Sequence, residues 1–224
     1  MNVAIIPAGG SGSRIGAGLP KQFVLVHDKP IIAYTLEKFN NHKSIDKIVV
    51  GTHPHYIEKT QKIIREYNIS KADTVIEGGA TRQETVYKCL LASQGDIALV
   101  HDAARPLVTD KIIHECIRLC PSCAASLSCD TILEGDGAMI TGKFDRTRCF
   151  LAQTPQCFPY GELLEAHKKA SQNGIEVTDD CSLLLEKGIH IVQGDTLNFK
   201  ITTPQDLALF MLLTSSSQTP HCTI

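Results

Sequence analysis

The sequence has no excess of charge of either sign, which separates it from proteins that wrap nucleic acid. It carries 22 Lys and Arg against 24 Asp and Glu in 224 residues, a formal net charge of −2. Proteins that wrap a duplex usually carry a clear basic excess. An acidic disordered chain is excluded as well, because 43% of the residues are hydrophobic and 21% are charged. We therefore expect no nucleic-acid partner, and any bound anion should be small and held at a local site.

The sequence also lacks a hydrophobic run long enough to cross a membrane. No stretch of about 18 consecutive apolar residues is present. The N-terminal segment MNVAIIPAGG has no basic region, and its apolar run is too short for a signal peptide. We therefore expect no membrane partner and a cytoplasmic location.

Paired cysteine motifs are scarce, although the chain has nine cysteines. An odd count in a chain of this length, without a signal peptide, argues against a disulfide framework. Cys120-Pro-Ser-Cys123 is a single CxxC motif, whereas a zinc site needs two such pairs or histidines at ligand spacing. Cys116 and Cys120 fit one face of a helix. We therefore expect buried, unreactive cysteines and assign no residue as a metal ligand.

What the sequence does contain is a regular alternation of short apolar runs with amphipathic segments. The runs are rich in Val and Ile and are bounded by turn residues, as expected for buried strands. The expected strands cover residues 3–7, 47–52, 74–76, 97–101, 124–128, 190–193 and 199–202. This alternation predicts one α/β domain over residues 1–224 with a doubly wound, mostly parallel, Rossmann-like sheet.

Capping residues mark where helices begin between these runs. Such starts occur at Pro30, at the capping box Thr81-Arg-Gln-Glu84, at Thr109, at Thr178 and at Thr203-Pro204. The helix that begins after Thr178 is expected to end at Gly188, because glycine is the usual residue after a helix C-terminus.

Residues 130–153 interrupt the alternation of strands and helices. A Gly-Asp-Gly turn lies at the centre of this segment, as in a β-hairpin. A hairpin cannot bury both of its faces alone. We therefore expect a projecting β-arm at about 130–153 that packs on a second copy of the chain, giving a homodimer.

The strongest functional signal is the glycine-rich segment from Pro7 to Phe23, PAGGSGSRIGAGLPKQF. Five glycines in ten residues allow the backbone N–H groups to approach a phosphate closely. Arg14 and Lys21 would bring two permanent positive charges to the same anion. The alternative is a tight turn that needs positive φ angles.

Two common phosphate-binding patterns do not fit this segment. The dinucleotide pattern GxGxxG fails at its last position, and in the P-loop pattern the lysine would have to follow glycine, whereas Lys21 follows Pro20. A GxxxGxG spacing together with Tyr34-x-x-x-Lys38 resembles short-chain dehydrogenases. The tyrosine pair lies far too early in the chain for that family, so we do not favour a dehydrogenase.

Seven segments in order resemble the 2-C-methyl-D-erythritol 4-phosphate cytidylyltransferases, within the wider group of sugar-nucleotide and polyol-phosphate nucleotidyltransferases. After the glycine-rich segment they are GGATRQETV (78–86), VHDAARP (100–106), FDR (144–146), QTPQCF (153–158), VTDD (177–180) and NFKITTPQDL (198–207). The resemblance covers nearly the whole chain. It implies the nucleotide-diphospho-sugar-transferase type of sheet.

The same resemblance implies a nucleotidyltransferase that transfers CMP from CTP to 2-C-methyl-D-erythritol 4-phosphate. The products would be 4-diphosphocytidyl-2-C-methyl-D-erythritol and pyrophosphate, in non-mevalonate isoprenoid precursor biosynthesis. Such a reaction needs positioning and cations on the developing charge more than covalent help. Mg²⁺ or another divalent cation would be held mainly by the CTP phosphates.

The resemblance also assigns roles to individual residues. The catalytic cations would be Arg14, Lys21, Arg146 and Lys200. The CTP contacts would come from Ala8, Gly9, Gly10, Gly12, Gly79, Arg82, Thr85, Ala103 and Arg105. The polyol contact would come from Asp102. Apart from the resemblance, the hydroxyls of Thr131, Thr154 and Thr178 are candidates to hydrogen-bond a polyol or its phosphate. We expect the cations Arg14, Lys21, Arg82, Arg105, Arg146 and Lys200 to converge at one cleft supplied by two subunits.

The local sequence around several of these residues gives expectations of its own, apart from the resemblance. Arg82 lies in the first turn of a helix, where it opposes the helix dipole, so we expect an anion or a base edge nearby. His101 is expected to pack at a strand end rather than act as a base. Arg146 either pairs with Asp145 on the surface or crosses to the neighbouring subunit. Lys200 has no obvious acidic partner in the sequence.

The sequence identifies the polyol phosphate substrate less clearly than it identifies CTP. Gly9 stands where many methylerythritol enzymes have alanine, and it is shared with ribitol-5-phosphate cytidylyltransferases, which would make CDP-ribitol. Ala104, the pair Arg82-Gln83 and the pair Thr178-Asp179 favour the methylerythritol enzymes. A nucleotide-sensing module without catalysis is the non-enzyme alternative, and the presence of all four catalytic cations argues against it.

Overall fold

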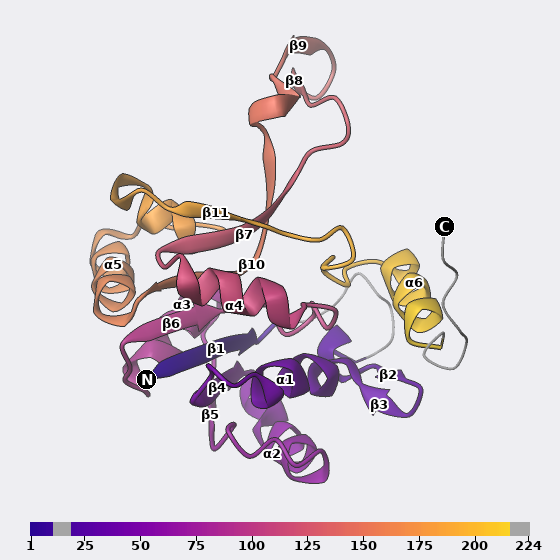
Figure 1. Ribbon diagram of the computed structural model, residues 1–224, viewed down its shortest axis with the longest axis vertical. Coiled ribbons are helices and arrows are strands. Elements are labelled where there is room, and N and C mark those ends of the chain that lie inside the picture. The colour runs from indigo at the N-terminus through magenta and orange to yellow at the C-terminus, as the bar shows by residue number, and fades with distance from the viewer. Residues whose placement is uncertain (11–18, 216–224) are drawn as a thin grey trace.

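The computed structural model describes residues 1–10 and 19–215, and its centre is a seven-stranded sheet of order β11-β7-β10-β6-β1-β4-β5 (Figure 1). The strands are β1 Asn2–Ala8, β4 Lys47–Thr52, β5 Thr74–Glu77, β6 Ile97–Val100, β7 Ser122–Leu127, β10 Phe150–Pro159 and β11 His190–Gln193. Strand β10 runs antiparallel to its neighbours β6 and β7, and the other pairs are parallel. The mostly parallel α/β sheet is therefore confirmed.

Helices cover both faces of this sheet, which makes it doubly wound. They are α1 Ile31–Asn41, α2 Ile57–Glu66, α3 Arg82–Leu91, α4 Asp110–Arg118, α5 Tyr160–Asn173 and α6 Pro204–Ser215. Along β1, Ala4 and Ile6 pack with residues of α1, α2 and α4, whereas Val3 and Ile5 pack with residues of α3 and α5. Successive strand residues point to opposite faces, so a strand covered on both sides becomes a continuous apolar run.

Shorter elements complete the structure. Two small hairpins are formed by β2 Leu25–Val26 with β3 Lys29–Pro30 and by β8 Leu133–Gly135 with β9 Ile140–Lys143. Single 3-10 turns cover Lys21–Phe23, Pro54–Tyr56, Arg146–Arg148, Cys181–Leu183 and Leu185–Lys187. Helix α6 packs through Phe210 in a small separate cluster with Val26, Ile31 and Ile201.

The predicted helix starts at Thr81 and Thr109 are confirmed by their hydrogen bonds. The Thr81 hydroxyl accepts from the Glu84 amide at 3.0 Å, and the Thr109 hydroxyl accepts from the Ile112 amide at 3.3 Å. The Glu84 carboxylate accepts from the Ala80 amide at 2.8 Å, one residue before the amide used in a standard capping box.

Two of the predicted elements are wrong. The helix expected from Thr178 to Gly188 is a pair of 3-10 turns, because the buried Leu184 between them is drawn into the core beside α5. Gly188 does end the second turn, with φ +69°. Residues 199–202 form no strand. They run as an extended segment held by a hydrogen bond from the Ile201 amide to the Ala104 carbonyl at 2.9 Å.

The arm predicted at residues 130–153 projects from the sheet at the junction of β7 and β10 (Figure 1). Its tip is the antiparallel β8–β9 pair, so the predicted hairpin is confirmed. Large apolar side chains remain exposed along it, including Met139 at 71% and Ile140 at 69%. The outer half of β10 belongs to this arm, which is why residues 150–159 do not stand out as a sheet strand in the sequence.

The described cysteines are free thiols, as expected, but they are not uniformly buried. Cys116 and Cys123 are buried, whereas Cys120 is partly exposed. Burial raises the pKa of the Cys116 thiol to about 12, so that side chain remains protonated and inert at neutral pH. Within residues 1–10 and 19–215, no cluster of three His, Cys, Asp or Glu side chains could hold a metal. No helix in that part of the chain has the length and apolar character to cross a membrane.

Candidate active site

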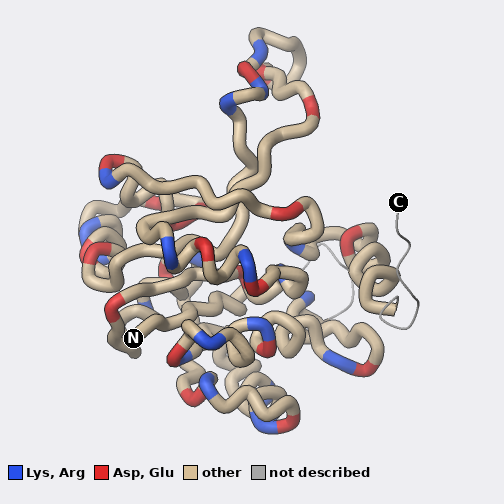
Figure 2. The backbone as a smooth tube through the Cα atoms, viewed as in Figure 1, with Lys and Arg blue, Asp and Glu red and all other residues tan. Residues whose placement is uncertain are grey.

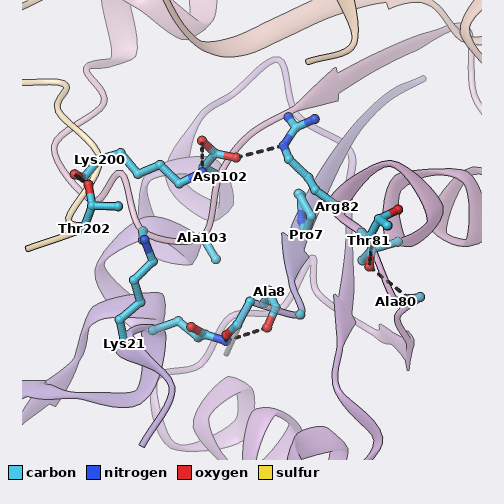
Figure 3. A pocket seen from close by; sticks show the side chains of 16 residues that line it. Pro7, Ala8, Lys21, Ala80, Thr81, Arg82, Asp102, Ala103, Lys200 and Thr202 are labelled. Carbon is cyan, nitrogen blue, oxygen red and sulfur yellow. Dashed lines mark hydrogen bonds and ion pairs between the residues drawn. The ribbon is translucent and has the colours of Figure 1, made fainter. Parts of the chain in front are cut away.

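A cavity of about 270 Å³ lies at the carboxyl ends of β1 and β6 (Figure 3). These two strands are parallel neighbours, so the residues that follow them meet at one edge of the sheet. Gly9 and Gly10 continue from β1, and Asp102 follows β6. The first turn of α3 forms another wall of the cavity. Ligands of α/β sheets bind at this edge.

Most of the residues predicted for the site line this cavity. They are Ala8, Gly9, Gly10, Lys21, Gly79, Arg82, Thr85, Asp102, Ala103 and Lys200. Gly12 and Arg14 lie outside the described residues. Arg105 and Thr154 lie behind Asp102, Thr178 is on an exposed loop, and Thr131 and Arg146 are on the arm.

The Asp102 carboxylate is shared by three cations. One oxygen accepts from Arg82 Nε at 3.1 Å, and the other lies 3.0 Å from Lys200 Nζ and 3.3 Å from Arg105 Nε. Figure 3 shows Asp102 between Lys200 and Arg82 at the top of the cavity. Burial alone would raise the pKa of Asp102, but the charges of Arg82, Lys200 and Arg105 outweigh it and hold the pKa far below its usual range. Asp102 is therefore ionised at neutral pH.

These contacts correct one expectation and explain another. Lys200 does have an acidic partner, Asp102, which a sequence separation of 98 residues conceals. Arg82 does have the anion expected beside the first turn of α3, and the anion is a protein carboxylate. Arg105, predicted to contact the nucleotide, instead donates from Nη1 to the Asn198 carbonyl at 2.8 Å and has a side chain only 12% exposed.

A chain of hydrogen bonds behind the cavity fixes the backbone at Asp102. The Asp102 amide donates to Thr154 Oγ1 at 3.1 Å, and this hydroxyl lies 3.0 Å from His101 Nδ1. His101 Nε2 lies 3.0 Å from the Arg105 carbonyl, which can only accept. His101 therefore carries its proton on Nε2 and accepts from Thr154 through Nδ1. Burial lowers the pKa of His101 to about 4, which agrees with a packed, neutral histidine and not with a base in contact with substrate.

Thr154 and Thr85 were both predicted as ligand contacts, and both hydroxyls are already engaged within the protein. Thr154 is 3% exposed and supports Asp102. Thr85 donates to the Thr81 carbonyl at 2.9 Å and accepts from the Gly79 amide at 2.9 Å. Thr85 therefore shapes the turn that carries Gly79, and its contribution to a ligand would come through that backbone.

Gln22 was not singled out from the sequence, yet it organises the glycine-rich segment. Its side-chain amide donates to the Ala8 carbonyl at 2.5 Å and to the Gly10 carbonyl at 3.2 Å. Gln22 is 3% exposed and follows Lys21 in the same 3-10 turn. Its place directly after Lys21 in the PKQF segment does not reveal its burial or its two acceptors, so the sequence offered no signal for this role. These two bonds fix the carbonyls of Ala8 and Gly10 where the chain leaves β1.

The two arm residues predicted for the site lie together but apart from the cavity. Thr131 and Arg146 line one surface depression with Lys143, Phe144 and Asp145. Arg146 Nη1 donates to the Cys129 carbonyl at 3.2 Å, while Asp145 accepts from the amide and hydroxyl of Thr147. The surface ion pair considered for Arg146 and Asp145 is thus replaced by a turn cap on Asp145.

The expected convergence of cations is therefore partial within one chain. Lys21, Arg82 and Lys200 surround the cavity, with Arg105 directly behind it. Arg146 is on the projecting arm. Elsewhere basic and acidic residues are interspersed over the whole molecule, the arm included (Figure 2). A small cavity lined by three cations on a surface of mixed charge agrees with the near-zero net charge.

This chain is similar to known proteins both in its sequence and in its fold. A protein of Clostridium botulinum, named 2-C-methyl-D-erythritol 4-phosphate cytidylyltransferase, is 40% identical over 217 residues, covering 93% of this chain and 95% of the relative. A protein of the same name from Bacillus cytotoxicus is 38% identical over 216 residues, covering 93% of this chain and 96% of the relative.

Solved structures extend the similarity to three dimensions. The enzyme of that name from Thermus thermophilus superposes with a TM-score of 0.77 at 30% identity, covering 96% of this chain and 100% of the other. The 4-diphosphocytidyl-2C-methyl-D-erythritol synthase of Anaerococcus prevotii superposes with a TM-score of 0.84 at 23% identity, covering 96% of each chain, and supports the fold alone. Residues 2–214 match the family described as IspD, 2-C-methyl-D-erythritol 4-phosphate cytidylyltransferase. The chain belongs to this family.

Proposed function

We propose that this chain transfers CMP from CTP to 2-C-methyl-D-erythritol 4-phosphate and releases pyrophosphate. The observation that carries the proposal is the arrangement of Lys21, Arg82 and Lys200 around one cavity, beside the two glycines that follow β1. Family membership over residues 2–214 makes this the favoured chemistry for such an arrangement.

In this reaction a phosphate oxygen of the polyol attacks the α-phosphorus of CTP, and the bond to the pyrophosphate oxygen breaks. Negative charge grows on the oxygens of the transferred phosphate, so fixed cations stabilise the transition state more than the ground state. Lys21 lies on the cavity wall formed by the 3-10 turn at the end of the glycine-rich segment, where it can meet that charge. Lys200 and Arg82 stand on either side of Asp102 and can exchange part of their pairing with it for contacts to substrate oxygens.

A divalent cation fits this cavity only if the substrate supplies most of its ligands. Among the described lining residues Asp102 is the one carboxylate, and three protein cations already share it. Oxygen ligands for Mg²⁺ would therefore come mainly from the CTP phosphates. When bound, Mg²⁺ would neutralise triphosphate charge, while Lys21 and Lys200 position the phosphate that is transferred.

The arm supports a proposed homodimer in which each site is completed by the partner. Several large apolar side chains stay exposed on the arm, and exposed apolar surface on a projecting element can mark an interaction site. Thr131 and Arg146 lie in one depression there, where they could hold the phosphate of the polyol. The cytoplasmic location expected from the sequence stays a prediction.

The test is to offer CTP with either polyol phosphate and to measure pyrophosphate release. Release with 2-C-methyl-D-erythritol 4-phosphate, and not with ribitol 5-phosphate, is expected. The ribitol alternative is not favoured, because the curated relatives described above carry the methylerythritol name. CTP binding without turnover of either polyol phosphate would instead support a nucleotide-sensing module.

A further inference from the structure

The Arg82 guanidinium is held between two carboxylates that lie in different segments. Its Nε donates to Asp102 at 3.1 Å and its Nη1 donates to Asp180 at 2.8 Å. Asp102 lines the cavity together with Arg82, whereas Asp180 lies behind the arginine in the loop after α5. Asp180 is in the VTDD motif, but sequence reasoning gave it no role.

Asp180 is itself rigidly placed. Its side chain is 1% exposed, and its second oxygen lies 3.0 Å from Nε2 of the fully buried His167 of α5. Because a carboxylate can only accept, His167 carries a proton on Nε2. The Asp180 amide donates to the Gln156 side chain on β10 at 2.8 Å. Burial would raise the pKa of Asp180, but Arg82 and the hydrogen bond from His167 lower it overall, so the carboxylate is charged.

The two carboxylates are not equivalent anchors for Arg82. Asp102 is shared with Arg105 and with Lys200, and its pairing with Lys200, which also lines the cavity, can change when a phosphate or a polyol enters. An arginine anchored only there could follow those changes or adopt other rotamers. Asp180, set behind the cavity wall and fixed by His167 and Gln156, gives Arg82 an anchor that an entering substrate does not contact.

We propose that Asp180 is a positioning residue, which holds the Arg82 guanidinium at the cavity wall in the orientation that binds CTP. His167 and Gln156 fix Asp180 from α5 and β10. This inference rests on the proposed function, because it takes CTP as the ligand of Arg82. Its ion pair with Asp180 would otherwise serve only to hold the loop after α5 against α3.

The test is a double-mutant cycle on the Kd for CTP, measured by calorimetry without a polyol phosphate so that no turnover occurs. Asp180→Asn keeps the size of the side chain and removes its charge. It should weaken CTP binding about tenfold or more, the change expected from losing about 1.4 kcal/mol. Arg82→Ala should weaken binding at least as much. In the Arg82→Ala background, Asp180→Asn should change the Kd less than about twofold.

Asp179→Asn is the matched control. This neighbouring carboxylate bonds the amide and hydroxyl of Ser182 and leaves the Arg82 anchor intact. Its Kd should stay within about twofold of the wild-type value. Three outcomes would overturn the proposal: an unchanged Kd in Asp180→Asn, an unchanged Kd in Arg82→Ala, or the same loss on replacing Asp180 with and without Arg82.

A second pair of variants serves if Asp180→Asn does not fold. His167→Leu removes the donor to Asp180, whereas His167→Gln retains a donor. CTP binding should weaken several-fold in the leucine variant and recover in the glutamine variant, and equal Kd values in both would contradict the proposal. Failure of the proposed function is read separately, as absence of pyrophosphate release by wild-type protein that still binds CTP.

Discussion

At the scale of single residues, the cavity pairs cations with one shared carboxylate. Asp102 keeps Lys200 and Arg82 in place in the protein without ligand, where uncompensated charges in a partly buried cleft would repel one another. An entering triphosphate brings several negative charges and can replace part of that pairing. The cost of releasing Asp102 is limited because Arg105 remains with it behind the cavity.

Lys21 is the residue whose loss should affect the chemical step most selectively. Lys21→Ala should lower kcat about 10²–10³-fold with a smaller change in KM for CTP, because charge on the transferred phosphate grows in the transition state. Steady-state pyrophosphate release measures both constants. Lys62→Ala, which removes an exposed ion pair with Glu66 on α2, is the control and should leave both unchanged. An unchanged kcat in Lys21→Ala would contradict this role.

Because His101 is buried and neutral, the free energy of unfolding should depend on pH. Burial lowers its pKa to about 4, whereas in the unfolded chain it returns to about 6.5. Between these values the unfolded state binds more protons, so the free energy of unfolding should fall as the pH is lowered through this range. The loss should approach about 3 kcal/mol. His42, whose pKa burial also lowers, adds a contribution of the same sign.

Urea unfolding between pH 7 and pH 4.5 measures this effect. The window lies above the range where Asp102 and Asp180, with lowered pKa values, would lose their charges. In His101→Gln the dependence on pH should be shallower than in the wild type. A flat curve for the wild-type protein would show that His101 is charged in the folded state.

At the scale of elements, the sequence correctly predicted the strands and helices whose own run of residues shows which positions are buried. Strands β1 and β4 are covered on both faces, so their apolar runs mark their bounds to within a residue or two. The segments 178–188 and 199–202 were wrong because distant partners decide them. Leu184 packs into the core beside α5, and Ile201 bonds to the Ala104 carbonyl.

The same distinction separates the site residues that were found from those that were missed. The glycine-rich segment after β1 and the VHDAARP motif at the end of β6 pointed to Gly9, Gly10 and Asp102, which do line the cavity. Asp180 and Gln22 support other groups from behind, and nothing in a sequence shows which side chain a buried carboxylate or amide will reach.

The contact between β4 and α3 is an element-scale feature that can be tested through one glycine. A Cβ on Gly51 would lie 2.6 Å from Thr85 Cγ2 and 2.7 Å from Cys89 Sγ, closer than real contacts allow. Gly51→Ala should therefore push α3 away and lower the free energy of unfolding by about 1–3 kcal/mol. CTP binding should weaken too, because Thr85 holds the Gly79 turn.

Urea unfolding and CTP calorimetry measure the two effects. Gly161→Ala in α5 is the matched control, since a Cβ there has nothing within 4 Å. That change should leave CTP binding intact and alter stability by no more than about 1 kcal/mol, in the stabilising direction. Wild-type stability in Gly51→Ala would mean that α3 can shift without cost.

At the scale of the whole molecule, the arm separates Arg146 from the cavity of its own chain, so the proposed site requires two subunits (Figure 1). A net charge of −2 gives no hint of this arrangement, because basic and acidic residues alternate along much of the described chain (Figure 2). Whether Arg146 serves the cavity of its own chain or that of the partner chain can be decided only by separating the contributions of the two chains.

Mixing two variants that each lack one cation makes that separation, with the polyol phosphate held below the raised KM of the Arg146→Ala variant, so that each variant alone is nearly inactive. Arg146→Ala should raise the KM for the polyol phosphate and leave the KM for CTP nearly unchanged, and Lys21→Ala should remove most of kcat. In a mixed dimer, one site combines the intact cavity of the Arg146→Ala chain with the intact arm of the Lys21→Ala chain. Random mixing of equal amounts should therefore restore about a quarter of the wild-type sites. Pyrophosphate release after dissociation and reassociation of the mixed variants measures the recovery, and each variant treated alone is the control. If Arg146 served the cavity of its own chain, every site in the mixture would lack one of the two cations, and no activity would return.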